Sequence, residues 1–127
     1  VTAISMKPKR YVVGIYKDTL TLEWMRTSEQ AVLQFLGKDN LPQCRLLGFQ
    51  SGKKVNKTAQ LNKRKVLDQW KGFPILRNCA AVVLLQKRSM TSAGDHDLVL
   101  FDVIGSRTFH EQVLMLNDLR SAKMIRI

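Results

Sequence analysis

The chain has 127 residues, of which 45% are hydrophobic and 24% charged, a composition typical of a globular protein with a single core. Its 21 Lys and Arg outnumber 10 Asp and Glu, so the net charge is +11 and the isoelectric point is about 10.1. No apolar run approaches the ~20 residues that cross a bilayer. The first ten residues contain Lys7, Lys9 and Arg10 and lack the apolar stretch of a signal peptide. We therefore expect one domain over residues 1–127, with neither a membrane span nor a secretory signal.

Hydrophobic periodicity predicts that short strands dominate the chain. Alternating or β-branched runs predict strands over residues 1–6, 11–16, 31–36, 79–89 and 96–107. The last two strands are separated by residues 90–95, a small and polar segment that is typical of a turn.

Helices are expected to be few and short. Thr21 carries the hydroxyl of a helix N-cap, and Glu23 suits the first turn that would follow it. Asp39 or Asn40 is the expected cap of a second helix. Helices are thus expected over 22–26, 41–49 and within the tail 113–127, whereas 65–76 is expected to be irregular.

This irregular alternation excludes a doubly wound sheet and predicts a barrel or sandwich with a few helical insertions. Neither a Gly-x-Gly-x-x-Gly nor a Walker motif is present. Cys44 and Cys79 lack the spacing of a zinc site, so no metal is expected. Cys79 lies in an apolar run and is expected to be a buried thiol. Two cysteines of this kind suit the cytoplasm.

The excess of positive charge favours an anionic partner: a nucleic acid, an acidic membrane surface or a phosphorylated small molecule. The basic residues cluster at 7–10, 52–57 and 62–65, and solvated turns explain each cluster equally well. Only Tyr11 adjoins a cluster, whereas nucleic-acid binding usually interleaves aromatic and basic residues. Neither nucleic acid nor a membrane is therefore expected as a partner.

Five segments in succession resemble the flavin-reductase-like family of FMN-binding split β-barrels. They are VTAISMKPKRYVVGIYKDTLTLEWM (1–25), AVLQFL (31–36), SGKKVNK (51–57), FPILRNCAAVV (73–83) and GDHDLVLFDV (94–103). The resemblance implies a mainly β fold with short helices, in which the N-terminal strands of the family are missing. It also implies a cytoplasmic homodimer with flavin at the subunit interface.

The function implied by the resemblance is an oxidoreductase that transfers hydride from NAD(P)H to flavin. FMN is the expected cofactor, with FAD as an alternative. The alternative function, from the charge alone, is a non-enzymatic basic β-barrel module that binds an anionic ligand or nucleic acid.

His96, in the Gly-Asp-His segment, is placed by the resemblance at the flavin or nicotinamide side of the active site. Its imidazole would orient the nicotinamide or stabilise negative charge as the flavin is reduced. The alternative is a turn histidine that ends a strand. His110 has no comparable context and is expected to lie on the surface.

The flavin phosphate is expected at the start of the first helix, where backbone N–H groups lack partners. Lys17, Thr19 and Thr21 would surround it. The family often carries Arg where this chain has Thr19, so Lys17 is the expected substitute. The alternative is that Thr21 only caps the helix.

Two further segments are assigned to the cofactor by the resemblance. Lys53 and Lys57 match the basic positions of a Ser-Gly-Arg-Asp-x-Asp-Lys loop, in which Lys54 and Asn56 replace the two acids. The first strand matches a Thr-Ala-Val-Ser motif and supplies Thr2, Ala3 and Ser5.

Overall fold

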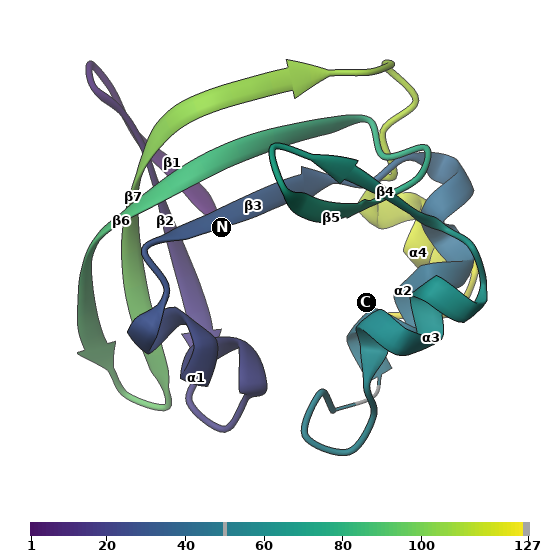
Figure 1. Cartoon of the computed structure of the whole chain (residues 1–127), viewed down its shortest axis with the longest axis horizontal. Helices are drawn as coiled ribbons and strands as arrows, with labels where there is room; N and C mark the ends of the chain where they lie inside the picture. The colour runs from purple at the N-terminus through teal and green to yellow at the C-terminus, as the bar shows by residue number, and fades with distance from the viewer. Residues whose placement is uncertain (50, 126–127) are drawn as a thin grey trace. The chain divides into compact units, whose positions relative to one another are not determined.

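A computed structural model describes residues 1–49 and 51–125, and its strands form an antiparallel sheet in the order β1-β2-β7-β6-β3 and a separate β4–β5 hairpin (Figure 1). The strands are β1 (Thr2–Met6), β2 (Lys9–Tyr16), β3 (Gln30–Phe35), β4 (Leu67–Trp70), β5 (Phe73–Leu76), β6 (Ala81–Ala93) and β7 (His96–Thr108). The helices are α1 (Leu20–Thr27), α2 (Leu41–Phe49), α3 (Lys57–Lys63) and α4 (Leu116–Ser121), with a 3₁₀ turn η1 (Lys38–Asn40). The expectation of a mainly β fold with short helices is confirmed.

The chain divides into two compact units. The first unit comprises Val1–Leu33 and Val83–Ser106, and the second comprises Gln34–Val82 and Arg107–Ile127. Among the described residues, no helix combines the length and apolar character that crossing a membrane requires.

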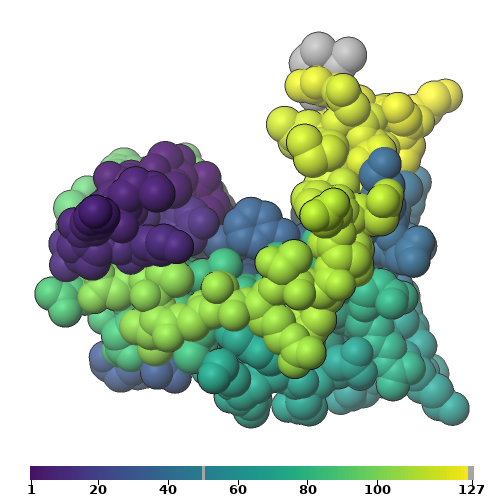
Figure 2. Space-filling view, turned by 90° about the horizontal axis from the view of Figure 1, so that it is seen from above, coloured from purple at the N-terminus to yellow at the C-terminus, as the bar shows by residue number. Residues whose placement is uncertain are grey.

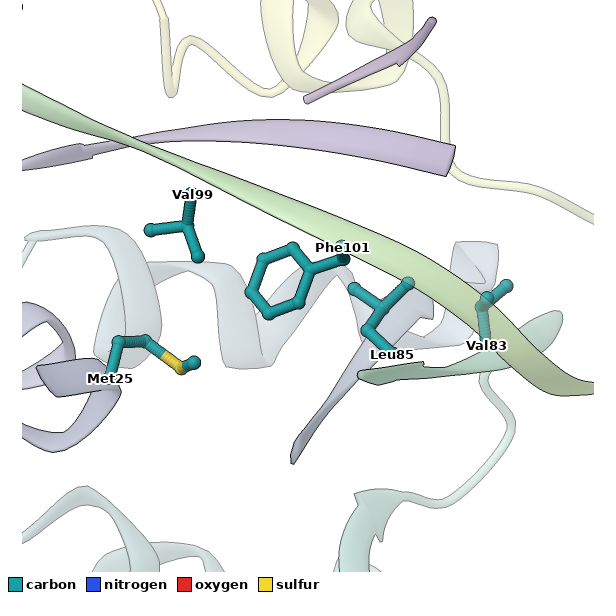
Figure 3. Packing of buried hydrophobic residues seen from close by; sticks show 5 residues of the cluster. All are labelled: Met25, Val83, Leu85, Val99 and Phe101. Atoms are coloured by element: carbon teal, nitrogen blue, oxygen red, sulfur yellow. The ribbon is translucent and has the colours of Figure 1, made fainter. Parts of the chain in front are cut away.

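The core of the first unit lies between its strands and α1. Val99 and Phe101 alternate with outward residues on β7 and meet Val83 and Leu85 of β6 (Figure 3). Met25 of α1 closes this cluster, and all five side chains are buried. Burying one such side chain contributes about 1.5–3 kcal/mol. The cluster therefore fixes α1 to this face of the sheet.

Helix α1 begins earlier than the sequence predicted. Its N-cap is Thr19, whose hydroxyl oxygen accepts the N–H of Leu22 at 3.2 Å and donates to the Tyr16 carbonyl at 2.8 Å. The expectation that Thr21 caps the helix is wrong. Since α1 begins at Leu20, its first turn already contains Thr21, which is exposed.

A tight turn joins β6 to β7, as expected, but it spans only Gly94 and Asp95. Gly94 has φ +66°, and Asp95 has no positive φ, which is the pattern of a type II′ hairpin turn with glycine at its first central position. A Cβ at Gly94 would meet nothing within 4 Å, so only the backbone conformation requires glycine there.

The second unit has its own small core, formed by Leu46 of α2, Leu61 of α3 and Leu76 of β5. Cys79 is 2% exposed, as expected, and burial raises the pKa of its thiol. The tail contains the short helix α4 that was also expected.

Two elements of the second unit were not predicted. The segment 65–76 was expected to be irregular, but most of it forms the β4–β5 hairpin, whose turn residues Lys71 and Gly72 both have positive φ. Helix α3 was also missed, although Asn56 is a regular N-cap that accepts the Ala59 N–H at 3.0 Å.

Asn40 has a different role from the cap that was expected for α2. Its side chain is 2% exposed, accepts the Gly37 N–H at 2.8 Å and donates to the Arg77 carbonyl at 2.7 Å. It therefore closes the η1 turn and ties it to the end of β5. The predicted bounds of the helix itself, 41–49, are confirmed.

His110, which was expected to lie on the surface, is partly exposed in the second unit and makes two hydrogen bonds. Its Nδ1 accepts the Gln112 N–H at 3.0 Å, so the proton is on Nε2, which donates to the Asn78 carbonyl at 2.8 Å. Gly37 packs against this arrangement: a Cβ there would clash with the Asn78 carbonyl and lie 2.9 Å from His110 Cε1.

Gly37→Ala is expected to destabilise the protein by about 1–3 kcal/mol, because a backbone carbonyl cannot move aside as a flexible side chain can. Urea denaturation followed by circular dichroism measures the change. The matched control is Gly48→Ala in α2, where a Cβ meets nothing within 4 Å. That variant is expected to gain about 0.5–1 kcal/mol from its helix position. Equal effects of the two substitutions would contradict the packing of Gly37.

Candidate functional site

The candidate site lies at one end of the first unit, where β2 ends, α1 begins and the β6–β7 turn folds back (Figure 1). Strand pairing sets Tyr16 opposite His96, and the Lys17 N–H donates to the Asp95 carbonyl at 2.9 Å. The structure thus brings Lys17, Thr19 and His96, three predicted site residues, to the same end of the sheet.

His96 is held by two neighbours. Its Nδ1 lies 2.7 Å from Asp95 Oδ1, and its ring stands edge-on to Tyr16 with the centroids 5.5 Å apart. An ionised carboxylate only accepts hydrogen bonds, so Nδ1 carries a proton. Among the described residues Nε2 makes no hydrogen bond, and the side chain is 46% exposed. His96 therefore presents Nε2 to a ligand.

The charge state of Asp95 supports this orientation. The hydrogen bond from His96 lowers the pKa of the Asp95 carboxyl below its ordinary value, and the positive charge of Lys17 acts in the same direction. The carboxylate is therefore ionised throughout the neutral range and keeps its acceptor role toward Nδ1.

Lys17 is tied to the same hairpin. Its ammonium donates to Ser92 Oγ at 2.6 Å and lies 3.9 Å from Asp97 Oδ1. The Thr19 hydroxyl is fully engaged as the cap of α1. Of the two threonines, Thr21 is the one whose exposed hydroxyl can meet a ligand. The N–H groups of the first helical turn there have no intrahelical acceptor.

The residues assigned to flavin binding on β1 lie farther along the sheet. Thr2 pairs with Val12 and Ala3 with Tyr11, and Ser5 follows a bulge. Val12 is four residues from Tyr16, which corresponds to about 13 Å along a strand. Strand β1 is therefore not brought beside His96. Figure 2 shows the N-terminal residues in dark purple on the surface of the first unit.

Lys53 and Lys57 belong to the second unit. The Lys57 ammonium donates to the Leu47 carbonyl at 2.8 Å, in the last turn of α2, where carbonyl groups lack helical partners. The Lys53 backbone N–H donates to Ser51 Oγ at 3.2 Å. Both contacts shape the loop before α3, and the assignment of these lysines to a cofactor stays a prediction.

The family model described as "Flavin reductase like domain" matches residues 1–122. The chain belongs to this family.

Solved structures share the fold of this flavin reductase-like chain. An FMN-binding protein from Thermus thermophilus, with bound 1-cyclohex-2-enone, has a TM-score of 0.73 at 23% identity, over 84% of this chain and 58% of its own. A Streptomyces globisporus NADH:FAD oxidoreductase with NAD and FAD fragments has 0.72 at 17%, over 85% and 62%. Flavoredoxin from Methanosarcina acetivorans has 0.72 at 14%, over 92% and 61%.

The flavin reductase-like chain thus spans roughly three fifths of the length of these three proteins. Among curated proteins no relative matches. The expectation of one domain over 1–127 and that of missing N-terminal strands stay predictions.

Sequence reasoning missed four residues of this flavin reductase-like site: Tyr16, Ser92, Asp95 and Asp97. Asp95 could have been found, because it precedes His96 at a turn and its carboxylate reaches a neighbouring ring. Tyr16 is recognised only from the pairing of β2 with β7. Ser92 and Asp97 are recognised only from their contacts with the Lys17 ammonium. Among the described residues, no group of three His, Cys, Asp or Glu is placed to hold a metal ion.

Proposed function

We propose that the chain is a flavin-dependent oxidoreductase that binds FMN and receives hydride from NAD(P)H. The observation that carries this proposal is the oriented His96, with Nε2 exposed at the same end of the first unit as the start of α1. Family membership supports it. So do the fold neighbours, one described as FMN-binding and another as an NADH:FAD oxidoreductase.

The first turn of α1 fits a phosphate group. Its first N–H groups and the positive end of the helix dipole favour an anion, the Thr21 hydroxyl is exposed, and Lys17 lies three residues before Leu20, where α1 begins. We assign the FMN phosphate to these groups. Thr19 contributes indirectly, by holding the helix start in place. FAD, which carries a pyrophosphate, is the alternative flavin.

His96 is assigned to the nicotinamide. FMN, when bound, supplies the ring that accepts a hydride. With the proton on Nδ1, the Nε2 of His96 is a hydrogen-bond acceptor and can receive an N–H of the nicotinamide carboxamide. Tyr16 and Asp95 hold the imidazole so that little side-chain entropy is lost when the nucleotide binds.

We also propose a homodimer with flavin at the subunit interface. Strand β1 is at one edge of the sheet, and its Ile4 and Met6 are 53% and 75% exposed. An exposed apolar edge strand invites pairing with another chain. The cytoplasm remains the proposed compartment, because Cys44 and Cys79 are free thiols. Light scattering tests the dimer, and a flavin-loaded monomer would refute it.

A spectrum of the purified protein titrated with FMN tests the function. Bound flavin should absorb near its free maximum with altered fluorescence, and NADH or NADPH should bleach it in the absence of oxygen. A protein that stays colourless with a large excess of FMN, or a bound flavin that neither nucleotide reduces, would overturn the proposal.

Thr21→Ala is expected to weaken FMN binding about tenfold, because one hydrogen bond to a charged phosphate is lost. Riboflavin, which has no phosphate, should bind as before. The matched control is Thr19→Ala, which removes the helix cap and should lower stability by about 1 kcal/mol. Thr21→Ala should leave stability within about 0.5 kcal/mol. Equal losses of FMN and riboflavin affinity in Thr21→Ala would refute the phosphate assignment.

A further inference from the structure

The positive charge of the chain is concentrated in the second unit. The first unit contains seven Lys and Arg against six Asp and Glu, whereas the second contains fourteen against four. Almost the whole net charge therefore belongs to one unit. Such segregation favours an anionic partner on that unit.

Most of this charge surrounds α3. From Asn40 to Leu67 the sequence has no Asp or Glu, and residues 53–65, here called the basic segment, carry six Lys or Arg. In the first unit, by contrast, Arg10 lies 2.7 Å from Asp102. The exposed cations of the basic segment that form no ion pair with any described residue are Lys54, Lys63, Arg64 and Lys65. Their charge is available to a ligand.

The basic segment also has a shape. An open depression of about 320 Å³ runs along α3 and is lined by Lys54, Val55, Asn56, Ala59, Gln60 and Lys63. Asn56, Gln60 and Lys63 are four and three residues apart, so they share one helix face, while Leu61 points into the core. Two lysines and two amide side chains therefore line the depression.

Lys65 occupies a backbone position that usually favours glycine. It follows α3 with φ +56°, and its N–H donates to the Asn62 carbonyl at 3.0 Å, while Val66 donates to the Leu61 carbonyl at 3.3 Å. This is a Schellman motif, in which glycine usually takes the left-handed position because a Cβ is strained there. A lysine at this position adds a positive charge at the cost of backbone strain.

The composition of the basic segment discriminates among anionic partners. Among the described residues between Phe49 and Leu98 no large hydrophobic residue is exposed, so the basic segment has no exposed apolar or aromatic side chain to insert into a membrane or to stack on bases. Five of its six cations are lysines, which are depleted from protein–protein interfaces. Lysine contacts a phosphate as a point charge and needs no fixed geometry.

We infer that the basic segment binds the phosphodiester backbone of a nucleic acid without reading its bases. The inference is independent of flavin, and it revises the sequence-based expectation that nucleic acid is not a partner. Four free cations imply about four phosphate contacts, for which the logarithm of the affinity falls with the logarithm of salt with a slope of about −3.6 on duplex DNA.

Fluorescence anisotropy with a labelled 20-base-pair duplex tests the inference. The dissociation constant should rise about 100-fold between 50 and 200 mM salt. In Lys54→Gln/Lys63→Gln the slope should fall by about half, and binding at 50 mM should weaken at least about tenfold. Lys63→Gln/Arg64→Gln should lower the slope and the affinity by similar amounts. Agreement between the two double variants excludes a local folding defect in either one as the cause.

The matched control removes the same charge from the first unit. Lys7 and Lys9 are exposed, and Lys7→Gln/Lys9→Gln should change the affinity less than about twofold. Equal weakening by the control pair would overturn the inference, because net charge alone would then explain binding. Absence of binding at 50 mM salt would overturn it as well. So would binding of polyglutamate or of phosphatidylserine vesicles as tight as that of the duplex.

Discussion

His96→Ala is expected to slow the reduction of bound flavin by NAD(P)H about 10- to 100-fold, which is the cost of losing one orienting contact to a reacting ring. The affinity for FMN should change less than about twofold, because the phosphate is assigned to the start of α1 and not to the imidazole. Because the His96 side chain is 46% exposed, its replacement by alanine should also leave the fold intact.

Anaerobic stopped-flow absorbance measures the hydride transfer, and reduction by dithionite serves as the internal control because it needs no nicotinamide. Dithionite should reduce the variant at the rate of the parent protein. His110→Ala provides the opposite pattern: it breaks the contacts to Asn78 and Gln112, so it should lower stability and spare the reduction rate. An unaltered NAD(P)H rate in a stable His96→Ala variant would exclude His96 from the site.

The strands of the long β6–β7 hairpin could be predicted from sequence because both are apolar and β-branched and a glycine turn separates them. The β4–β5 hairpin could not. Its turn places Lys71 at a left-handed position where Asn or Gly is the usual signal, and its strands have four residues each. Helix α3 could not be predicted either, because it has one buried apolar side chain, Leu61, and therefore no apolar periodicity in the sequence.

The start of α1 was misplaced for a different reason. Both Thr19 and Thr21 suit an N-cap, and the sequence alone does not say which turn faces the core. The hydroxyl of Thr19 decides between them, because it accepts the Leu22 N–H and donates to the Tyr16 carbonyl at the end of β2. The same limit applies to the site. His96 and Lys17 could be named from their segments, whereas Tyr16 and Ser92 join them only through strand pairing and side-chain reach.

Asp95→Asn is expected to lower the rate of NAD(P)H-dependent reduction about tenfold without loss of stability. The substitution keeps the size of the side chain and removes its charge. An ionised carboxylate accepts only, so it selects the His96 tautomer with the proton on Nδ1, whereas the asparagine amide can accept or donate and stabilises either tautomer. Nitrogen NMR of the imidazole should show protonated Nδ1 in the parent and a mixture in the variant.

The pH dependence of this contact has a defined sign. The pKa of Asp95 in the folded protein lies below its ordinary value of 3.8, so the bond to His96 is fully present above that value. It is lost only as the pH falls through the lowered pKa. The Asp95 carboxylate should therefore stay ionised, and keep accepting a hydrogen bond from His96 Nδ1, as the pH falls from neutral to the ordinary pKa of aspartate, and carbon NMR of the carboxyl group measures this.

The Asp95 side chain is exposed, and the tautomer population and the reduction rate together test whether it positions His96. A mixed tautomer population with a slowed reduction shows that Asp95 positions His96. A parent protein with the proton on Nε2 would contradict the contact itself. An Asp95→Asn variant with mixed tautomers and a normal rate would show that the orientation of His96 does not limit hydride transfer, and the imidazole would then act through its bulk or its charge.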